Sequence, residues 1–234
     1  MAVAAAGAMQ IVNTVVYVRS QLGLGDTAVA IAFAAAGGGS MVVALTLPRV
    51  LDRLPQRPPM LLGGVLMTAS LFLGLLEPNY GALLALWFVL GAGTSLVLTP
   101  AGRLLKQSCR EQDRPALFSA QFSLSHGCWL VAYPLAGWLG AGAGMTTTFA
   151  VLGVIAFAST IAAAAVWPSD DPLVLEHDHR AQTHGHLHCH DEHHQHEHEG
   201  WEGPEPHAHP HFHRLGRHRH AFVIDPHHAI WPSR

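Results

Sequence analysis

The chain has 234 residues, of which 50% are apolar and only 12% are charged, about half the charged share of an ordinary globular domain. A net charge of −3 gives no basic surface for nucleic acid. No nucleophile–base set, phosphate-binding loop or pair of buried carboxylates indicates an enzyme, and we expect no resident cofactor.

Six stretches without Asp, Glu, Lys or Arg follow one another before Pro168. They cover residues 1–18, 27–47, 59–76, 80–100, 115–139 and 145–167. A helix needs about 20 apolar residues to cross a bilayer core of about 30 Å, and Gly, Pro and charged residues lie between the stretches. The pattern predicts an all-α integral membrane domain of six transmembrane helices over residues 1–168. The glycine groups at 37–39, 63–64 and 91–93 favour close helix packing.

Basic residues lie mostly on one side of these predicted helices. On the opposite side only Arg19 appears, against seven residues in the loops after the second and fourth stretches: Arg49, Arg53, Arg57, Arg103, Lys106, Arg110 and Arg114. Loops rich in Lys and Arg face the cytoplasm. We therefore expect a multi-pass protein of the inner membrane with both termini in the cytoplasm.

The fifth stretch contains His126, the one histidine in any predicted span. An ionisable residue at membrane depth is a functional candidate, and Gln121, Ser125 and Cys128 lie along a nearby helical face. Two interpretations are open. The face lines a transport path, where His126 contacts a cation or carries a proton, or His126 is a neutral side chain bonded to a neighbouring helix.

The first stretch carries a polar stripe on an otherwise apolar helix. Gln10, Asn13, Thr14 and Tyr17 recur at spacings of three and four residues. We include Gln10 and Asn13 among the candidate transport-path residues. The alternative is interhelical hydrogen bonding without a role in transport.

Residues 169–234 contain 18 of the 19 histidines, few aliphatic residues and many prolines. This composition predicts a disordered, low-complexity cytoplasmic tail. Imidazole suits Ni²⁺, Co²⁺, Zn²⁺ and Cu²⁺, and the candidate metal ligands are His184, His186, His188, Cys189, His190, His193, His194, His196, His198, His207, His209, His211 and His213. A solvated appendage without metal is the alternative.

The loop from Pro48 to Arg57 resembles the short basic loop between the second and third helices of each half of major facilitator superfamily transporters. Asp52 and Arg53 match that motif's charged pair, Arg57 matches a later basic position, and Pro48 and Pro55 replace its two glycines. Residues 102–140 are similar to the tenth and eleventh helices of bacterial members.

The resemblance implies that residues 1–168 form the C-terminal six-helix half of a twelve-helix transporter that works by alternating access. Asp52, Arg53 and Arg57 would then belong to a gating loop. A second six-helix half would come from an upstream segment or from another chain.

Three functions are compatible with the sequence. Similarity to histidine-tailed nickel-resistance exporters favours secondary active export of a divalent transition metal, captured by the tail. The same bundle is also compatible with efflux of an organic solute or drug, with a tail that only senses or buffers metal. A metal-binding membrane protein without transport is the third.

Overall fold

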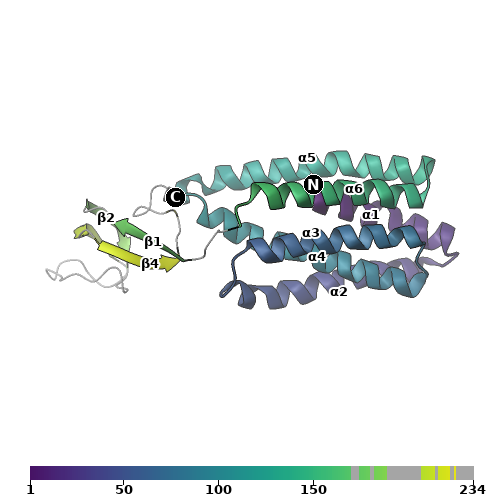
Figure 1. Ribbon diagram of the computed structural model, residues 1–234, viewed down its shortest axis with the longest axis horizontal. Helices are drawn as coiled ribbons and strands as arrows, with labels where there is room; N and C mark the ends of the chain where they lie inside the picture. Colours follow the sequence, from purple (N-terminus) through teal and green to yellow (C-terminus); the bar gives the residue numbers. More distant parts are fainter. Residues whose placement is uncertain (170–173, 180–181, 189–206, 214–215, 222–223, 225–234) are drawn as a thin grey trace. The chain divides into compact units, whose positions relative to one another are not determined.

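A computed structural model describes residues 1–169, 174–179, 182–188, 207–213, 216–221 and 224. The chain divides into two compact units, Met1–Pro172 and Leu173–Arg234. The first unit contains long antiparallel helices joined by short connections (Figure 1). They are α1 (Ala2–Val16), extended by a π-helical turn over Tyr17–Gln21, α2 (Asp26–Leu51), α3 (Arg57–Leu73), extended by a 3₁₀ turn over Gly74–Leu76, α4 (Tyr80–Gln107), α5 (Arg114–Gly142) and α6 (Met145–Val166).

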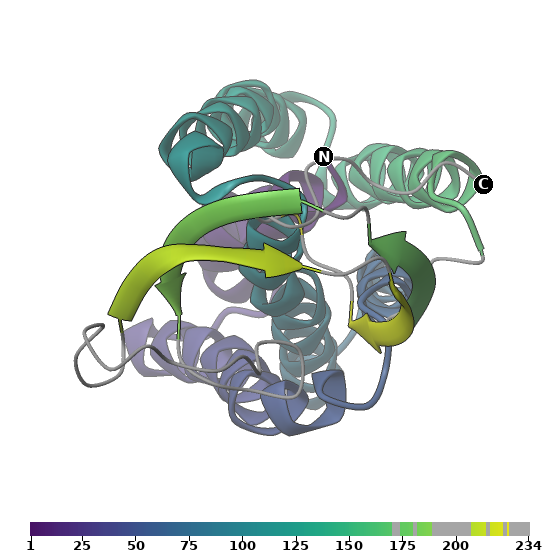
Figure 2. The same cartoon turned by 90° about the vertical axis from the view of Figure 1, so that its left-hand side faces the viewer.

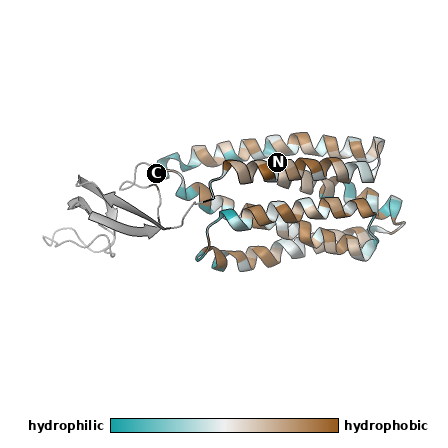
Figure 3. Ribbon diagram, viewed as in Figure 1, coloured by the Kyte–Doolittle hydropathy of each residue, from teal (hydrophilic) through white to brown (hydrophobic). Residues whose placement is uncertain are grey.

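Five of these helical segments are long and apolar enough to cross a membrane: Ala2–Gln21, Asp26–Leu51, Arg57–Leu76, Tyr80–Gln107 and Met145–Val166. Figure 3 shows the apolar residues along their lengths. The segment predicted as the fifth span forms α5, which has 29 residues but is not among the five. Its sequence is interrupted by Gln121, His126 and several serines, which lower its hydropathy. These five helices indicate a multi-pass membrane protein. Membrane crossing by α5 stays a prediction.

The helix ends follow local chemistry. The Asn79 side chain accepts a hydrogen bond from the Ala82 backbone N–H at 3.0 Å and so caps the start of α4. Gly144, with φ of +84°, makes the turn between α5 and α6 in a backbone region that suits glycine. Proline occurs inside three helices, at Pro48, Pro100 and Pro134, where neighbouring helices in a membrane bundle compensate the lost backbone hydrogen bond.

Glycines bring the helices into backbone contact, as their grouping predicted. A Cβ atom at Gly39 of α2 would overlap the Phe88 carbonyl of α4, and a Cβ at Gly91 of α4 would overlap the Ala36 carbonyl of α2. Gly64 of α3 lies against the Thr160 side chain of α6, which a Cβ atom would overlap. Without these glycines the helix pairs would have to move apart.

The interior of the helical unit is centred on α1, which touches each of the other helices (Figure 2). Tyr17, Trp87 and Phe149 are fully buried there. The ring of Phe149 meets those of Tyr17 and Trp87 edge to face, with ring centroids 5.9 and 6.4 Å away. Aromatic pairs in this geometry stabilise a core beyond their buried area.

The second unit contains four strands in the part that the structure describes: β1 (Val174–His179), β2 (Gln182–His188), β3 (His207–His213) and β4 (Gly216–Ala221). β1 pairs with β4 and β2 pairs with β3, both antiparallel. This differs from the disordered tail that composition predicted. The reason lies in the spacing: histidine recurs at every second residue, which is the period of a strand, and pairing satisfies the backbone groups that a sequence without a core leaves exposed.

Candidate functional site

The polar stripe of α1 points into the bundle and is held by interhelical hydrogen bonds. Asn13 is buried, and its Nδ2 donates to the Ala136 carbonyl of α5 at 3.1 Å. Thr14 is also buried. Its hydroxyl donates to the Gln10 carbonyl and accepts a bond from the Trp87 indole N–H of α4 at 2.7 Å. These hydrogen bonds join α1 to α5 and α4 and give both buried side chains partners in the interior.

The Tyr17 hydroxyl continues this network by donating to the Pro78 carbonyl at 3.0 Å. Gly140 of α5 lies so close to the Asn13 side chain that a Cβ atom there would overlap it. Gln10 is only half-buried, and its neighbour Ile11 is exposed. Two residues of α1 were predicted to line a transport path. Of these, Asn13 is hydrogen-bonded to a neighbouring helix, and Gln10 lies at the edge of an exposed face.

His126 lies on an exposed part of α5, ten residues before Ala136. Its ring stacks on Phe122 with centroids 3.8 Å apart and an interplanar angle of 27°. Its Nδ1 is 2.8 Å from the Phe122 carbonyl oxygen and 3.4 Å from the Ser125 hydroxyl. Gln121 and Ser125 are half-buried on the same helix. These contacts of His126 all lie within its own helix, so the structure does not show the bond to a neighbouring helix that one interpretation required.

The contact with Phe122 also fixes the form of the neutral ring. A carbonyl oxygen only accepts hydrogen bonds, so Nδ1 must carry the proton in this bond. The lone pair of a neutral His126 is then on Nε2. A nitrogen of this kind can accept a proton or ligate a cation.

The structure does not bring the α1 and α5 candidates together. Asn13 contacts α5 at Ala136, and ten residues of helix separate Ala136 from His126. At a rise of 1.5 Å per residue this corresponds to about 15 Å along the helix axis. The predicted path residues therefore form two groups at different depths.

The predicted gating loop is tied to α4 at two points. Asp52 Oδ1 is 3.0 Å from Arg103 Nη1, in an ion pair whose side chains are 69% and 39% exposed. Gln56 is buried, and its Nε2 donates to Gln107 Oε1 at 2.9 Å. Sequence reasoning counted Arg103 only as a basic loop residue and missed both glutamines. Their partners lie about fifty positions away in the sequence, and no local pattern indicates such a pairing.

Arg57 connects the same loop to the end of α6. Its Nε donates to the Trp167 carbonyl at 3.1 Å and its Nη2 to the Ala164 carbonyl at 3.0 Å. The last carbonyls of a helix lack partners within the helix and carry its partial negative charge, which a guanidinium neutralises. Arg53, the third predicted loop residue, is exposed. Asp52 thus links the ends of α2 and α4, and Arg57 links the start of α3 to the end of α6, while Arg53 lies at the surface.

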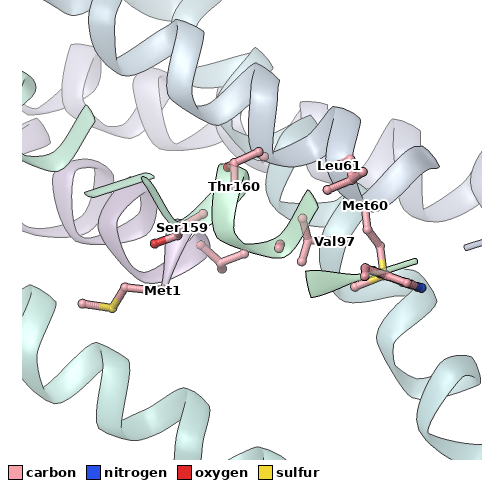
Figure 4. A pocket seen from close by; sticks show the side chains of 11 residues that line it. Met1, Met60, Leu61, Val97, Ser159 and Thr160 are labelled. Carbon is pink, nitrogen blue, oxygen red and sulfur yellow. The ribbon is translucent and has the colours of Figure 1, made fainter. Parts of the chain in front are cut away.

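A cavity of about 170 Å³ lies near this end of the unit, between α1, α3, α4 and α6 (Figure 4). Ser159 and Thr160 supply its polar lining, and both hydroxyls donate to carbonyls of their own helix. Apart from the indole of Trp167, the other lining side chains are apolar, and none belongs to the predicted path. The lining of the cavity is therefore mostly apolar, and it contains no residue predicted as a metal ligand.

The predicted metal ligands of the tail fall into two sets. On β2 and β3 lie His184, His186, His188, His207, His209, His211 and His213. Outside the described residues lie Cys189, His190, His193, His194, His196 and His198. Among the side chains that the structure describes, no group of three His, Cys, Asp or Glu residues could hold a metal ion.

The family model of the Major Facilitator Superfamily matches residues 1–219. The chain therefore belongs to this superfamily, whose members are secondary transporters and not enzymes. No curated protein matches the chain. The helical unit, the loop at Asp52 and the membrane-length segments are consistent with the resemblance that the sequence suggested.

Proposed function

We propose that the chain forms one half of a secondary active transporter that exports a divalent transition metal of the nickel or cobalt type. The observation that carries this proposal is the combination of a transporter bundle and a segment with 18 of the 19 histidines in one chain. Histidines suit borderline divalent ions. Located in the cytoplasm, as the basic loops favour, they would capture metal and raise its concentration beside the bundle.

The surface of the helical unit supports the need for a second six-helix half. On α5, Leu124, Leu130 and Trp138 are each more than 70% exposed, and on α2 Met41 and Leu45 are each at least 60% exposed. In a membrane such surfaces face lipid or another helix. Transporters of this type enclose their substrate site between two halves, and the exposed position of His126 on α5 suits a site completed by the other half.

The contacts of the basic loop fit a gate that opens and closes. An exposed ion pair such as Asp52–Arg103 contributes about 0–1 kcal/mol. It therefore orients the α2–α3 loop without locking it. Arg57 holds the loop to the end of α6 through two bonds, so that movement of α6 and of the loop would be coupled.

His126 is our candidate for the group that couples transport to protons or contacts the cation. It is the one histidine in the predicted spans, which contain no Asp, Glu, Lys or Arg. Nε2 supplies the lone pair that either role needs. Gln121 and Ser125, half-buried beside it, add polar groups to the same stretch of α5.

The test is made in the source organism by deleting the locus and measuring cell-associated nickel, cobalt, zinc and copper during exposure to each metal. We expect selective accumulation of one metal, reversed when the gene is restored. Unchanged levels of all four metals would refute metal export. A restored gene that encodes His126→Ala is the matched variant for the role of the bundle.

Efflux of an organic solute is the second candidate. One observation favours it: the described side chains of the helical unit form no metal-binding group. Removing residues 169–234 separates the two functions. Organic-solute efflux would survive this truncation and lose only its response to metal, whereas metal export that depends on capture would fall.

A further inference from the structure

The paired strands of the tail place histidines opposite one another. In the β2·β3 ribbon the Cα partners include His184 with His211, His186 with His209, and His188 with His207. Directly paired residues lie on the same face of an antiparallel ribbon, and so do residues two apart on one strand. One face therefore holds three successive histidine pairs, which we call the histidine ladder.

The opposite face of the same ribbon holds no histidine. Its paired positions are Thr183 with Phe212, Gly185 with Pro210, and Leu187 with Ala208. A slip of one residue between the strands would place every histidine of one strand opposite a residue of this other kind. In both strands histidine thus alternates with other residues, and the register places the histidines of one strand opposite those of the other.

The neighbouring ribbon supports this register independently. β1 pairs with β4 so that Glu176 lies opposite Arg219 and Asp178 lies opposite Arg217. Opposite charges at paired positions stabilise a ribbon, and like charges oppose it. The β1·β4 and β2·β3 pairings also share one register. In both ribbons the residue numbers of two paired residues have the same sum, as for Val174 with Ala221 and His188 with His207.

We propose that the histidine ladder is a metal-binding site in which each divalent transition-metal ion is held by a histidine pair, one from β2 and one from β3. Directly opposite Cβ atoms in a ribbon are about 4.5–5.5 Å apart. Two imidazoles at such positions can reach one ion at metal–nitrogen distances of about 2.0–2.1 Å. The next pair follows after about 6.6–6.8 Å of strand, so the ladder can hold ions in series.

Metal binding and strand pairing would then be coupled. An isolated two-stranded ribbon is only marginally stable in water, and β2 and β3 are separated by the 18 residues 189–206. A ligand that binds only the paired form stabilises that form. Rising cytoplasmic metal would therefore close the ladder, which makes the tail a responsive store and not a set of independent ligands.

The experiment uses the full chain purified in detergent and Ni²⁺ alone as the probe. In a parent variant, every histidine except His186 and His209 is replaced by glutamine. A one-strand exchange then combines His186→Leu with Leu187→His. A two-strand exchange adds Ala208→His and His209→Ala. All three proteins contain two histidines, and the two-strand exchange restores a directly opposed pair on the other face of the ribbon.

We expect the parent to bind one Ni²⁺, the one-strand exchange to weaken binding by about tenfold or more because the second ligand is no longer held nearby, and the two-strand exchange to restore it. Equal affinity in all three proteins, absence of binding by the parent, or failure of the two-strand exchange would each overturn the proposal. In the native chain, Ni²⁺ but not Mg²⁺ should slow hydrogen exchange of the amides in β2 and β3, and unchanged exchange would also contradict it.

This inference rests on the proposed capture of metal by the tail, but its test is separate from that of transport. If the histidine ladder does not bind Ni²⁺ but cells still export metal, the ladder proposal fails and the proposed export function stands. A ladder that binds Ni²⁺ in a chain without metal efflux would refute the exporter alone.

Discussion

The contact between α2 and α4 gives a quantitative prediction for Gly39→Ala. A Cβ atom at Gly39 would lie 2.8 Å from the carbonyl carbon of Phe88 and even closer to its oxygen, whereas real Cβ atoms keep at least 3.0 Å. The obstacle is backbone, so no side-chain rotation relieves the overlap. We expect the two helices to separate and the free energy of unfolding to fall by about 1–3 kcal/mol, as for overpacked sites in general.

Gly37→Ala is the matched control on the same helix. A Cβ atom there would have no atom within 4 Å. Alanine is favoured over glycine in a helix by about 1 kcal/mol, and this gain applies equally at both positions. The difference between the two variants therefore isolates the steric cost at the α2–α4 contact.

The assay is unfolding of the purified protein in mixed micelles with increasing sodium dodecyl sulfate, followed by helix content. Gly39→Ala should unfold at a lower detergent fraction than the native protein, and Gly37→Ala at an equal or higher fraction. Equal stability of the two variants would show that α2 and α4 do not meet through Gly39, and it would refute the packing described above.

Three further predictions concern single side chains. Arg57→Gln should lower the free energy of unfolding by about 1–2 kcal/mol, because two hydrogen bonds to the end of α6 are lost. Arg53→Gln, at an exposed position, should change the free energy of unfolding by less than about 0.5 kcal/mol. Detergent unfolding compares the two variants. Trp87→Phe leaves the buried Thr14 hydroxyl without its donor and should cost about 1–3 kcal/mol in the same assay; no loss would contradict the bond. His126→Ala should reduce transport while leaving unfolding unchanged, since the side chain is exposed; unchanged transport would remove His126 from the mechanism.

Much of the fold could be predicted because the membrane imposes strong rules on sequence. Apolar length located five of the membrane-spanning helices, and the glycines near 39, 64 and 91 indicated where helices approach closely. These signals are local in the sequence. The exception was α5, where polar residues at 119–127 reduce the apolar signal within a helix of 29 residues.

The partners of the polar side chains could not be predicted in the same way. Asn13 meets a carbonyl 123 positions away, and Trp87 donates to a hydroxyl 73 positions away. Such bonds depend on which helices become neighbours and on their rotation, neither of which a periodic pattern in one helix contains. The structure gives Asn13 and Thr14 of this stripe hydrogen bonds to other helices, but spacing alone could not separate a water-lined face from interhelical bonding.

The tail shows a different limit of composition-based reasoning. Few aliphatic residues and many prolines predict disorder, yet the alternation through His184, His186 and His188 has the period of a strand. In an apolar sequence, the same alternation at every second residue would predict a strand. Here the low hydrophobicity of the segment favoured a prediction of disorder instead. The register between β2 and β3 was not predictable, because the two strands are separated by 18 residues.

The most direct test of metal export is the rate at which preloaded cells lose nickel after transfer to metal-free medium, repeated with cobalt. Strains with the locus deleted, restored, or restored without residues 169–234 are compared at equal initial cell metal. The account predicts fast loss in the restored strain, slow loss in the deletion strain and an intermediate rate for the truncated chain. Equal rates of loss for both metals in all three strains would contradict it.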